Sequence, residues 1–218
     1  MLGNKIPLFI NDFNTAMIFV TFYLVNFTPF YLVFSSFPGR LSTTMLSTLF
    51  KALGVRTFCT LAFTAAQGKP SQFGYDIMIV GPILYPTLLG NMGPLFVNGL
   101  DLLKNGMPFP FQQSLFTATF YHFYVHDQTG VIGTTIRSAI GSVPGLTLGL
   151  SEKDFGLFVV SFIMHANAIL KMPEFLGPSF NPFGPIANIL TKIFQMKNYY
   201  GSEQKVEVPK KGAKEKSS

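Results

Sequence analysis

Two arginines and one lysine lie deep inside long uncharged stretches, and they are the first candidates for chemistry in this sequence. Arg137 is the only charged residue between Gln128 and Ser151, and Arg56 shares the apolar stretch 41–67 with Lys51. A charged side chain at the centre of a bilayer costs at least about 2.5 kcal/mol, so it usually faces a bundle interior or a water-filled cavity. The positions predict that Lys51, Arg56 and Arg137 line or gate a polar path.

A structural role is the other interpretation of the two arginines. Each guanidinium can donate to helix carbonyls or to a buried polar group and thereby fix the packing. A functional guanidinium would instead bind an anionic lipid headgroup or set an electrostatic barrier to cations. The sequence alone leaves both interpretations open.

Glycines accompany these cations at spacings that suit close helix packing. Gly141, Gly145 and Gly149 recur every four residues, which would strip one helix face of side chains and let a second backbone approach. Gly54 and Gly133 are predicted to permit kinks and close packing in the same way. Pro144 would break the hydrogen-bond ladder of its helix. The pattern favours an inner element of a membrane bundle over a lipid-facing one.

Enzyme chemistry is not supported by the remaining residues. His122 and His126 would share a helix face beside Asp127, which gives two imidazoles and an unpositioned carboxylate, fewer ligands than a zinc site uses. An interfacial histidine pair at a helix end is the preferred interpretation. The sequence contains neither a serine elbow nor a phosphate-binding glycine loop. The single cysteine, Cys59, is expected to be structural.

The composition indicates a multi-pass membrane protein made of helices. The chain has 218 residues, 12% of them charged against about 25% in soluble domains, and 25 phenylalanines. We expect residues 1–196 to be transmembrane and 197–218 to be a disordered lysine-rich tail. The predicted spans are 15–37, 41–67, 77–100, 111–125, 128–151 and 155–170, with 175–194 as a weaker seventh. The net charge of +6 comes without a basic patch interleaved with aromatics, so nucleic-acid binding is not expected.

The two halves of the chain suggest an internal repeat. Arg56 precedes Gly68 by the same interval that separates Arg137 from Gly149, and each glycine is followed by Phe-Gly at a similar distance. Repeat one would cover about 15–100 and repeat two about 109–171. Units of three spans must be inverted relative to each other, an arrangement common in transporters and some channels.

These residues resemble the trimeric intracellular cation channels. The run from Met45 to Gly54, continued through Gly68-Lys69-Pro70, is similar to that family's second and third helices. Gly130-Val131-Ile132-Gly133 before Thr134-Thr135-Ile136-Arg137 is similar to its glycine-rich fifth helix, and the lysine-rich tail is of the family's kind. The resemblance covers roughly residues 15–170.

The resemblance implies a seven-helix homotrimer with a potassium-permeable pore in each protomer, residing in the endoplasmic reticulum membrane. Such channels supply counter-ion current during calcium release. The family's fourth helix also carries a Lys-Glu-Val motif and basic residues that hold an inositol lipid. Neither Lys104-Asn105-Gly106 nor Phe111-Gln112-Gln113 provides such a cluster here. The expected partners are potassium ions, membrane lipid and two further copies of the chain.

Two other functions stay open at the level of sequence. The many phenylalanines and the missing basic motif also fit a non-catalytic accessory subunit of a large membrane complex, for example in the mitochondrial inner membrane. An inverted-repeat transporter of small solutes is the third alternative, and it would show saturable uptake. No cofactor is expected, apart from a bound anionic lipid.

Overall fold

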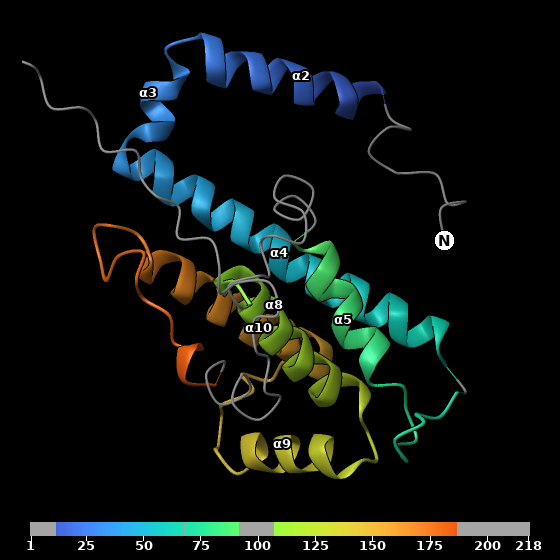
Figure 1. Ribbon diagram of the computed structural model, residues 1–218. Coiled ribbons are helices and arrows are strands. Elements are labelled where there is room, and N and C mark those ends of the chain that lie inside the picture. Colours follow the sequence, from blue (N-terminus) through green and yellow to red (C-terminus); the bar gives the residue numbers. More distant parts are fainter. Residues whose placement is uncertain (1–11, 68, 92–106, 187–218) are drawn as a thin grey trace, which may run out of the picture.

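The computed structural model describes residues 12–67, 69–91 and 107–186, and these residues form helices without any strand (Figure 1). The prediction of an all-α protein is therefore confirmed. The elements are α2 (Asp12–Phe27), α3 (Phe30–Ser35), α4 (Phe37–Ala65), α5 (Val80–Leu89), α8 (Phe109–Tyr121), the π-helix η1 (His122–His126), α9 (Val131–Gly141) and α10 (Glu152–Leu170).

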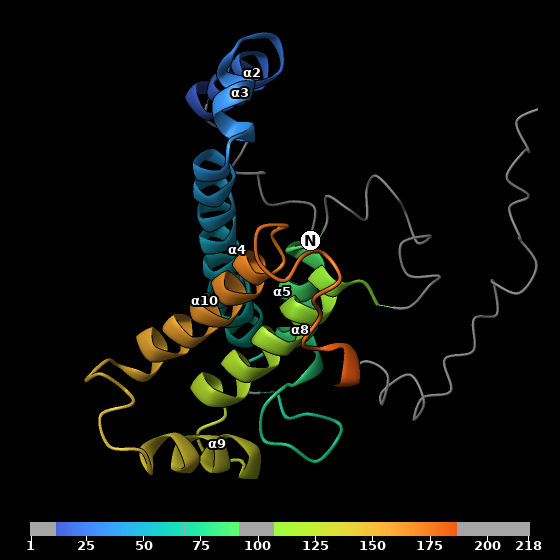
Figure 2. The ribbon, with the colours of Figure 1, turned by 90° about the vertical axis from the view of Figure 1, so that its left-hand side faces the viewer.

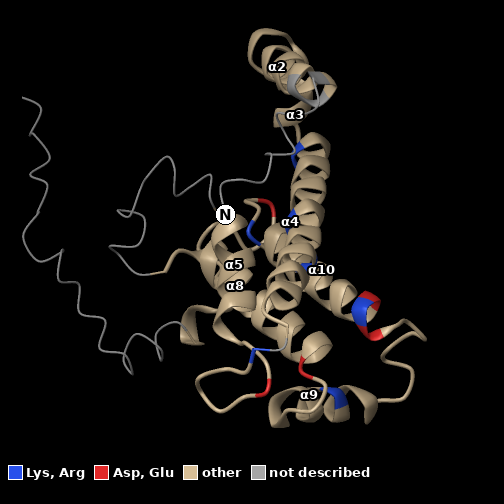
Figure 3. Ribbon diagram, turned by 90° about the vertical axis from the view of Figure 1, so that its right-hand side faces the viewer, with Lys and Arg blue, Asp and Glu red and all other residues tan. Residues whose placement is uncertain are grey.

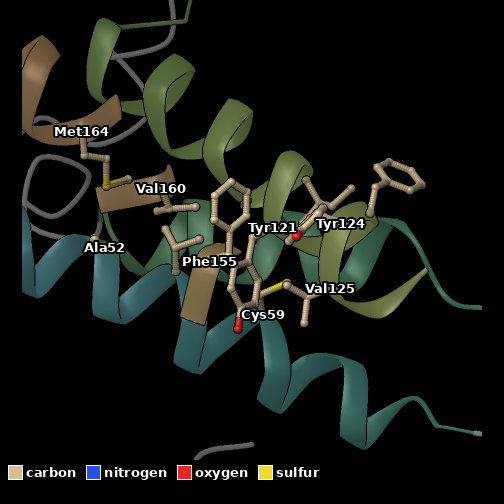
Figure 4. Packing of buried hydrophobic residues seen from close by; sticks show 12 residues of the cluster. Ala52, Cys59, Tyr121, Tyr124, Val125, Phe155, Val160 and Met164 are labelled. Carbon is tan, nitrogen blue, oxygen red and sulfur yellow. The ribbon is translucent and has the colours of Figure 1, made fainter. Parts of the chain in front are cut away.

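Helices α4, α5, α8 and α10 pack together as the central bundle. On α4 the inward face carries Ala52, Val55 and Cys59, whose spacing of three and four residues places them on one side of a helix. Ala52 and Cys59 are fully buried and small, so neighbouring helices can approach α4 closely. In Figure 4 Ala52 and Cys59 lie on the side of α4 that faces Tyr121 of α8 and Val160 and Met164 of α10.

Local capping explains where the two longest helices begin. The Ser36 hydroxyl accepts a hydrogen bond from the backbone N–H of Gly39, and Pro38 lies in the first turn of α4. The Ser151 hydroxyl does the same for Asp154 in α10, whose first turn also contains Glu152. Acidic residues at this end suit the positive end of the helix dipole.

Two of the described helices, α4 and α10, are long and apolar enough to cross a membrane. They contain 29 and 19 residues, or about 43 and 28 Å at 1.5 Å per residue, against a hydrocarbon core of about 30 Å. The segment Ala16–Phe27 and helix α5 are apolar but shorter. The expected span 15–37, interrupted in sequence by Asn26 and Pro29, is not one continuous helix, because it breaks between α2 and α3 at Thr28 and Pro29; that these residues cross a membrane stays a prediction.

The predicted span over 128–151 is also wrong. Helix α9 has only 11 residues and is followed by turns. Gly145 and Gly149 adopt φ angles of +75° and +70°, in the left-handed region that ends helices, and Pro144 cannot donate to the helical ladder. Gly141, Gly145 and Gly149 consequently do not form one face of a helix, although their sequence spacing predicts it.

The elements that carry the two arginines are not equivalent. Arg56 lies in the 29-residue helix α4, whereas Arg137 lies in the 11-residue helix α9. The expected correspondence of their two helices is therefore wrong, while the inverted repeat itself stays a prediction. Residues 92–100 of the third expected span, 187–194 of the seventh, and the tail 197–218 lie outside the described residues.

Two elements lie outside the central bundle. Helix α3 leads away from the N-terminal end of α4 and α2 turns back above it, while α9 lies on the opposite side of the bundle beside the ends of α8 and α10, as Figures 1 and 2 show. Charged residues are sparse along the whole ribbon and gather at the start of α10 and beside α9 (Figure 3). The sides of the bundle therefore carry few charged side chains, whereas the end near α9 carries several.

Candidate functional site

A line of buried polar side chains follows the inward face of α8 and continues into the π-helix η1. Ser114, Thr117 and Tyr121 recur at three- and four-residue intervals, which places them on one helix face. From Ser114 to His126 the line extends about 18 Å at 1.5 Å per residue. We name this set the polar stripe: Asn91, Ser114, Thr117, Tyr121, His122 and His126.

At one end the stripe is a network of satisfied hydrogen bonds. The amide of Asn91 donates to the Ser114 hydroxyl at 3.2 Å and to the Thr87 carbonyl at 2.7 Å. The Thr117 hydroxyl donates to the Gln113 carbonyl at 2.8 Å, and the Gln113 amide donates to the Met164 carbonyl at 3.1 Å. Buried amides and hydroxyls that are paired in this way fix the relative positions of α5, α8 and α10.

At the other end two imidazoles lie among aromatic rings. His122 is fully buried, and neither of its ring nitrogens forms a hydrogen bond with the described residues, although the backbone of Met78 lies beside the ring. The His126 ring stacks on Phe63 with centroids 4.3 Å apart, and its Nε2 lies 3.4 Å from the Thr60 hydroxyl. An unpaired buried polar group costs about 1–3 kcal/mol, and π-helices occur frequently at functional sites.

Beyond η1 the chain turns back on itself through a set of charge-assisted hydrogen bonds. The Asp127 carboxylate accepts from the backbone N–H groups of Gly130 and Gly133 at 2.8 and 2.9 Å. Arg137 donates to the carbonyls of Tyr124, Asp127 and Gln128 at 2.9, 2.7 and 2.8 Å. This Asp127–Arg137 latch ties α9 to the open end of η1, where carbonyls lack helical partners. It gives Arg137 the partners that its structural interpretation predicts.

Gly133 makes the latch sterically possible. A Cβ atom at this position would lie 2.0 Å from the Asp127 carbonyl oxygen and 2.6 Å from that of Phe123. Both neighbours are backbone, so neither can rotate away. The predicted packing role of Gly133 is thus visible as a direct contact of α9 with η1.

The other predicted packing glycines have more space. A Cβ at Gly54 would meet only the Phe58 ring at 3.7 Å, and one at Gly141, Gly145 or Gly149 would meet nothing within 4 Å. A site that the sequence did not single out is tighter: at Gly156 of α10 a Cβ would lie 2.8 Å from Val125 Cγ2. The apolar neighbours of this glycine in the sequence give no signal of that contact.

The predicted pore cations other than Arg137 lie near the surface of the bundle. Arg56 Nη1 is 3.5 Å from Asp154 Oδ1, with side chains 38% and 55% exposed. Lys51 is exposed on α4. The partners of Arg137 lie on η1 and in the turn after it, whereas the partner of Arg56 lies on α10, so these two cations share no partner among the described residues.

The histidine pair departs from its sequence-based interpretation. His122 and His126 were expected at an interface, but both rings are buried inside the described part of the protein. Asp127, an unpositioned carboxylate in the sequence, is buried and fully engaged by Gly130 and Gly133. The spacing Asp-x-x-Gly before an apolar run was the available signal for this helix-capping role.

Within the described residues no group of three or more His, Cys, Asp or Glu side chains could hold a metal ion. What the polar stripe offers is a row of hydroxyl, amide and imidazole groups without a net charge. Comparisons of the chain with models of protein families, with curated proteins and with solved structures found no match.

Proposed function

We propose that the chain is a membrane-embedded channel for monovalent cations, with potassium as the main ion, and that the ion path follows the polar stripe. The observation that carries this proposal is a set of buried, uncharged polar side chains that follows one face of α8 into η1 inside an otherwise apolar bundle. Polar residues within membrane bundles are expensive, and they mark ion or substrate pathways as a rule.

The chemistry of the stripe supports transport better than tight binding. Hydroxyl, amide and carbonyl oxygens can replace the hydration shell of a cation, while conduction needs sites weak enough to release it. The stripe combines Ser114, Thr117 and Tyr121 with Asn91 and has no carboxylate before Asp127, which the latch occupies. Outward faces of α4 and α10 carry exposed Phe50 and Phe162, as a lipid boundary requires.

The wider proposal follows the resemblance to the trimeric intracellular cation channels. It includes a homotrimer with one pathway in each protomer and residence in the endoplasmic reticulum membrane. Lys51 and the half-exposed Arg56 would tune ion entry or contact an anionic lipid headgroup at the surface. Arg137 acts here through the latch, which positions η1 at the end of the path.

A potassium flux assay in liposomes tests the path with a matched pair of variants. Thr117→Val removes a stripe hydroxyl, whereas Thr119→Val removes one on another face of α8; each hydroxyl bonds the carbonyl four residues earlier. We expect Thr117→Val to lower the flux at least severalfold and Thr119→Val to leave it unchanged. No flux through the unaltered protein would refute the channel, and equal effects of the two variants would refute the path.

One observation favours a second candidate, an accessory subunit of a larger membrane complex. The hydrogen bonds of Asn91, Thr117 and Gln113 are made within the bundle, as expected for a packing network. Size measurement in mild detergent separates the candidates. A channel of the proposed kind migrates as a discrete trimer, whereas an accessory subunit co-purifies with unlike chains.

A further inference from the structure

We infer that residues 16–35, which comprise most of α2 and all of α3, form an arm that lies among lipid acyl chains outside the bundle. This inference rests on the proposed membrane location, and it adds that the arm is covered by lipid on all sides instead of by a second copy of the chain. α3 leads away from the N-terminal end of α4, and α2 lies apart from the bundle, running back above α4 in the view of Figure 1 (Figures 1 and 2).

The arm is apolar around its whole circumference. Residues 16–24 are all exposed, although successive positions on a helix differ by about 100° in direction. Val20 and Phe22, about 200° apart, are 49% and 60% exposed, and α3 has no buried residue. The chain has no charged residue between Asp12 and Arg40. A helix that is hydrophobic all round is typical of burial in a core or in a membrane.

The polar side chains near the break in the arm bond to its own backbone. Asn26 donates to the Phe22 carbonyl at 2.8 Å, and Thr28 donates to the carbonyl of Leu24. Ser35 and Ser36 donate to the carbonyls of Leu32 and Val33 at 3.1 and 2.6 Å. Helix breaks are tolerated in lipid when nearby side chains and local bonds satisfy the backbone groups.

The corner between α3 and α4 holds the arm in place. A Cβ at Gly39 would lie 2.0 Å from the Val33 carbonyl oxygen, so the two helices meet backbone to backbone there. The Ser36 hydroxyl links both sides of the corner, since it donates to Val33 and accepts from Gly39. The neighbouring Arg40 forms an ion pair with Glu174, which fixes the start of α4 to the chain after α10.

Lipid fits this surface better than another protein copy does. Contacts between helices in a membrane are enriched in small residues that let the backbones approach closely, and residues 17–24 contain only one of these, Thr21. Arm residues 16–24 include no charged and no buried residue, so nothing distinguishes one face of the helix as the contact for a partner. Acyl chains require only that every direction be apolar.

The absence of tryptophan from the sequence allows a direct test. Single variants Val20→Trp and Phe22→Trp place the probe on opposite faces of α2. Phe162→Trp, on the exposed side of α10, reports whether the bundle is in the membrane, and Phe73→Trp lies in an exposed turn outside the helices. Each variant is reconstituted in vesicles with and without bromine on the phospholipid acyl chains, and fluorescence loss is measured.

We expect both arm variants to lose as much fluorescence as Phe162→Trp, and Phe73→Trp to lose little. If Phe162→Trp loses fluorescence but one of the two arm variants does not, protein covers that face of the arm. This result would refute the inference about the arm and leave the membrane location intact. If Phe162→Trp is not quenched either, the membrane location fails and the inference fails with it. All four positions are exposed, so the substitutions leave the core packing unchanged.

Discussion

Replacement of Gly133 by alanine tests the latch most directly. The backbone at this position does not have a positive φ, so alanine is allowed there by conformation. Its Cβ, however, would lie 2.0 and 2.6 Å from the carbonyl oxygens of Asp127 and Phe123. Since contacts below 3.0 Å are essentially never observed for real Cβ atoms, α9 must move away from η1.

The cost follows from the bonds that such a movement breaks. The Asp127 carboxylate would lose the Gly133 N–H at 2.9 Å, and the three carbonyl bonds of Arg137 would lengthen. A hydrogen bond to a charged group contributes about 1.5–3 kcal/mol, and overpacking alone costs about 1–3 kcal/mol. We therefore expect a destabilisation of about 3–5 kcal/mol, or a fall in the melting temperature of about 6–20 °C.

Gly141→Ala provides the control, because it changes the same residue type in the same helix. A Cβ at Gly141 meets nothing within 4 Å, so we expect a change below about 1 kcal/mol, in the stabilising direction. Thermal unfolding of both variants, followed by circular dichroism in detergent, compares them. If Gly133→Ala is as stable as Gly141→Ala, the contact of α9 with η1 does not exist as described.

Four further substitutions examine the roles of the buried and half-exposed polar groups. Arg137→Gln removes three hydrogen bonds to carbonyls and should lower the free energy of unfolding by at least about 2 kcal/mol. Arg56→Gln removes only an exposed ion pair, so the same unfolding measurement should show a change of less than about 1 kcal/mol. Asp127→Asn places an amide N–H against one of two backbone N–H donors, and chemical unfolding should show a loss of about 2–3 kcal/mol. His122→Leu removes two unpaired ring nitrogens, so it should raise the free energy of unfolding by up to about 2 kcal/mol. The same variant should lower the potassium flux. A loss of stability would show that the imidazole has a hydrogen-bond partner.

The sequence was sufficient for the parts of the fold that depend on local signals. Long apolar stretches predicted α4 and α10, and these two helices match their expected ranges of 41–67 and 155–170 closely. Prediction from the sequence failed where glycine and proline determine the conformation. Within 141–149 the same glycine spacing can line a helix face or supply left-handed turns, and the periodicity does not distinguish these outcomes.

The candidate site was harder to predict because its partners are backbone groups. Arg137 was singled out correctly as unusual, but the three carbonyls that receive its hydrogen bonds exist as a cluster only after the chain turns at Asp127. The polar stripe was overlooked because Ser114 and Thr117 are common residues in apolar helices. Only the packing of α5 and α10 around α8 shows that they are buried.

The π-helix η1 constrains how this region can change. A π-helix holds more residues per turn than an α-helix does, so it offsets the angular position of everything after it. If His122–His126 rewound into a regular α-helix without losing a residue, the residue that the π-turn had taken up would swing Asp127 about 100° around the helix axis. Its carboxylate would then point away from the amides of Gly130 and Gly133. The latch therefore requires both the π-helical turn and the aspartate that follows it, so evolution would keep or lose the two together.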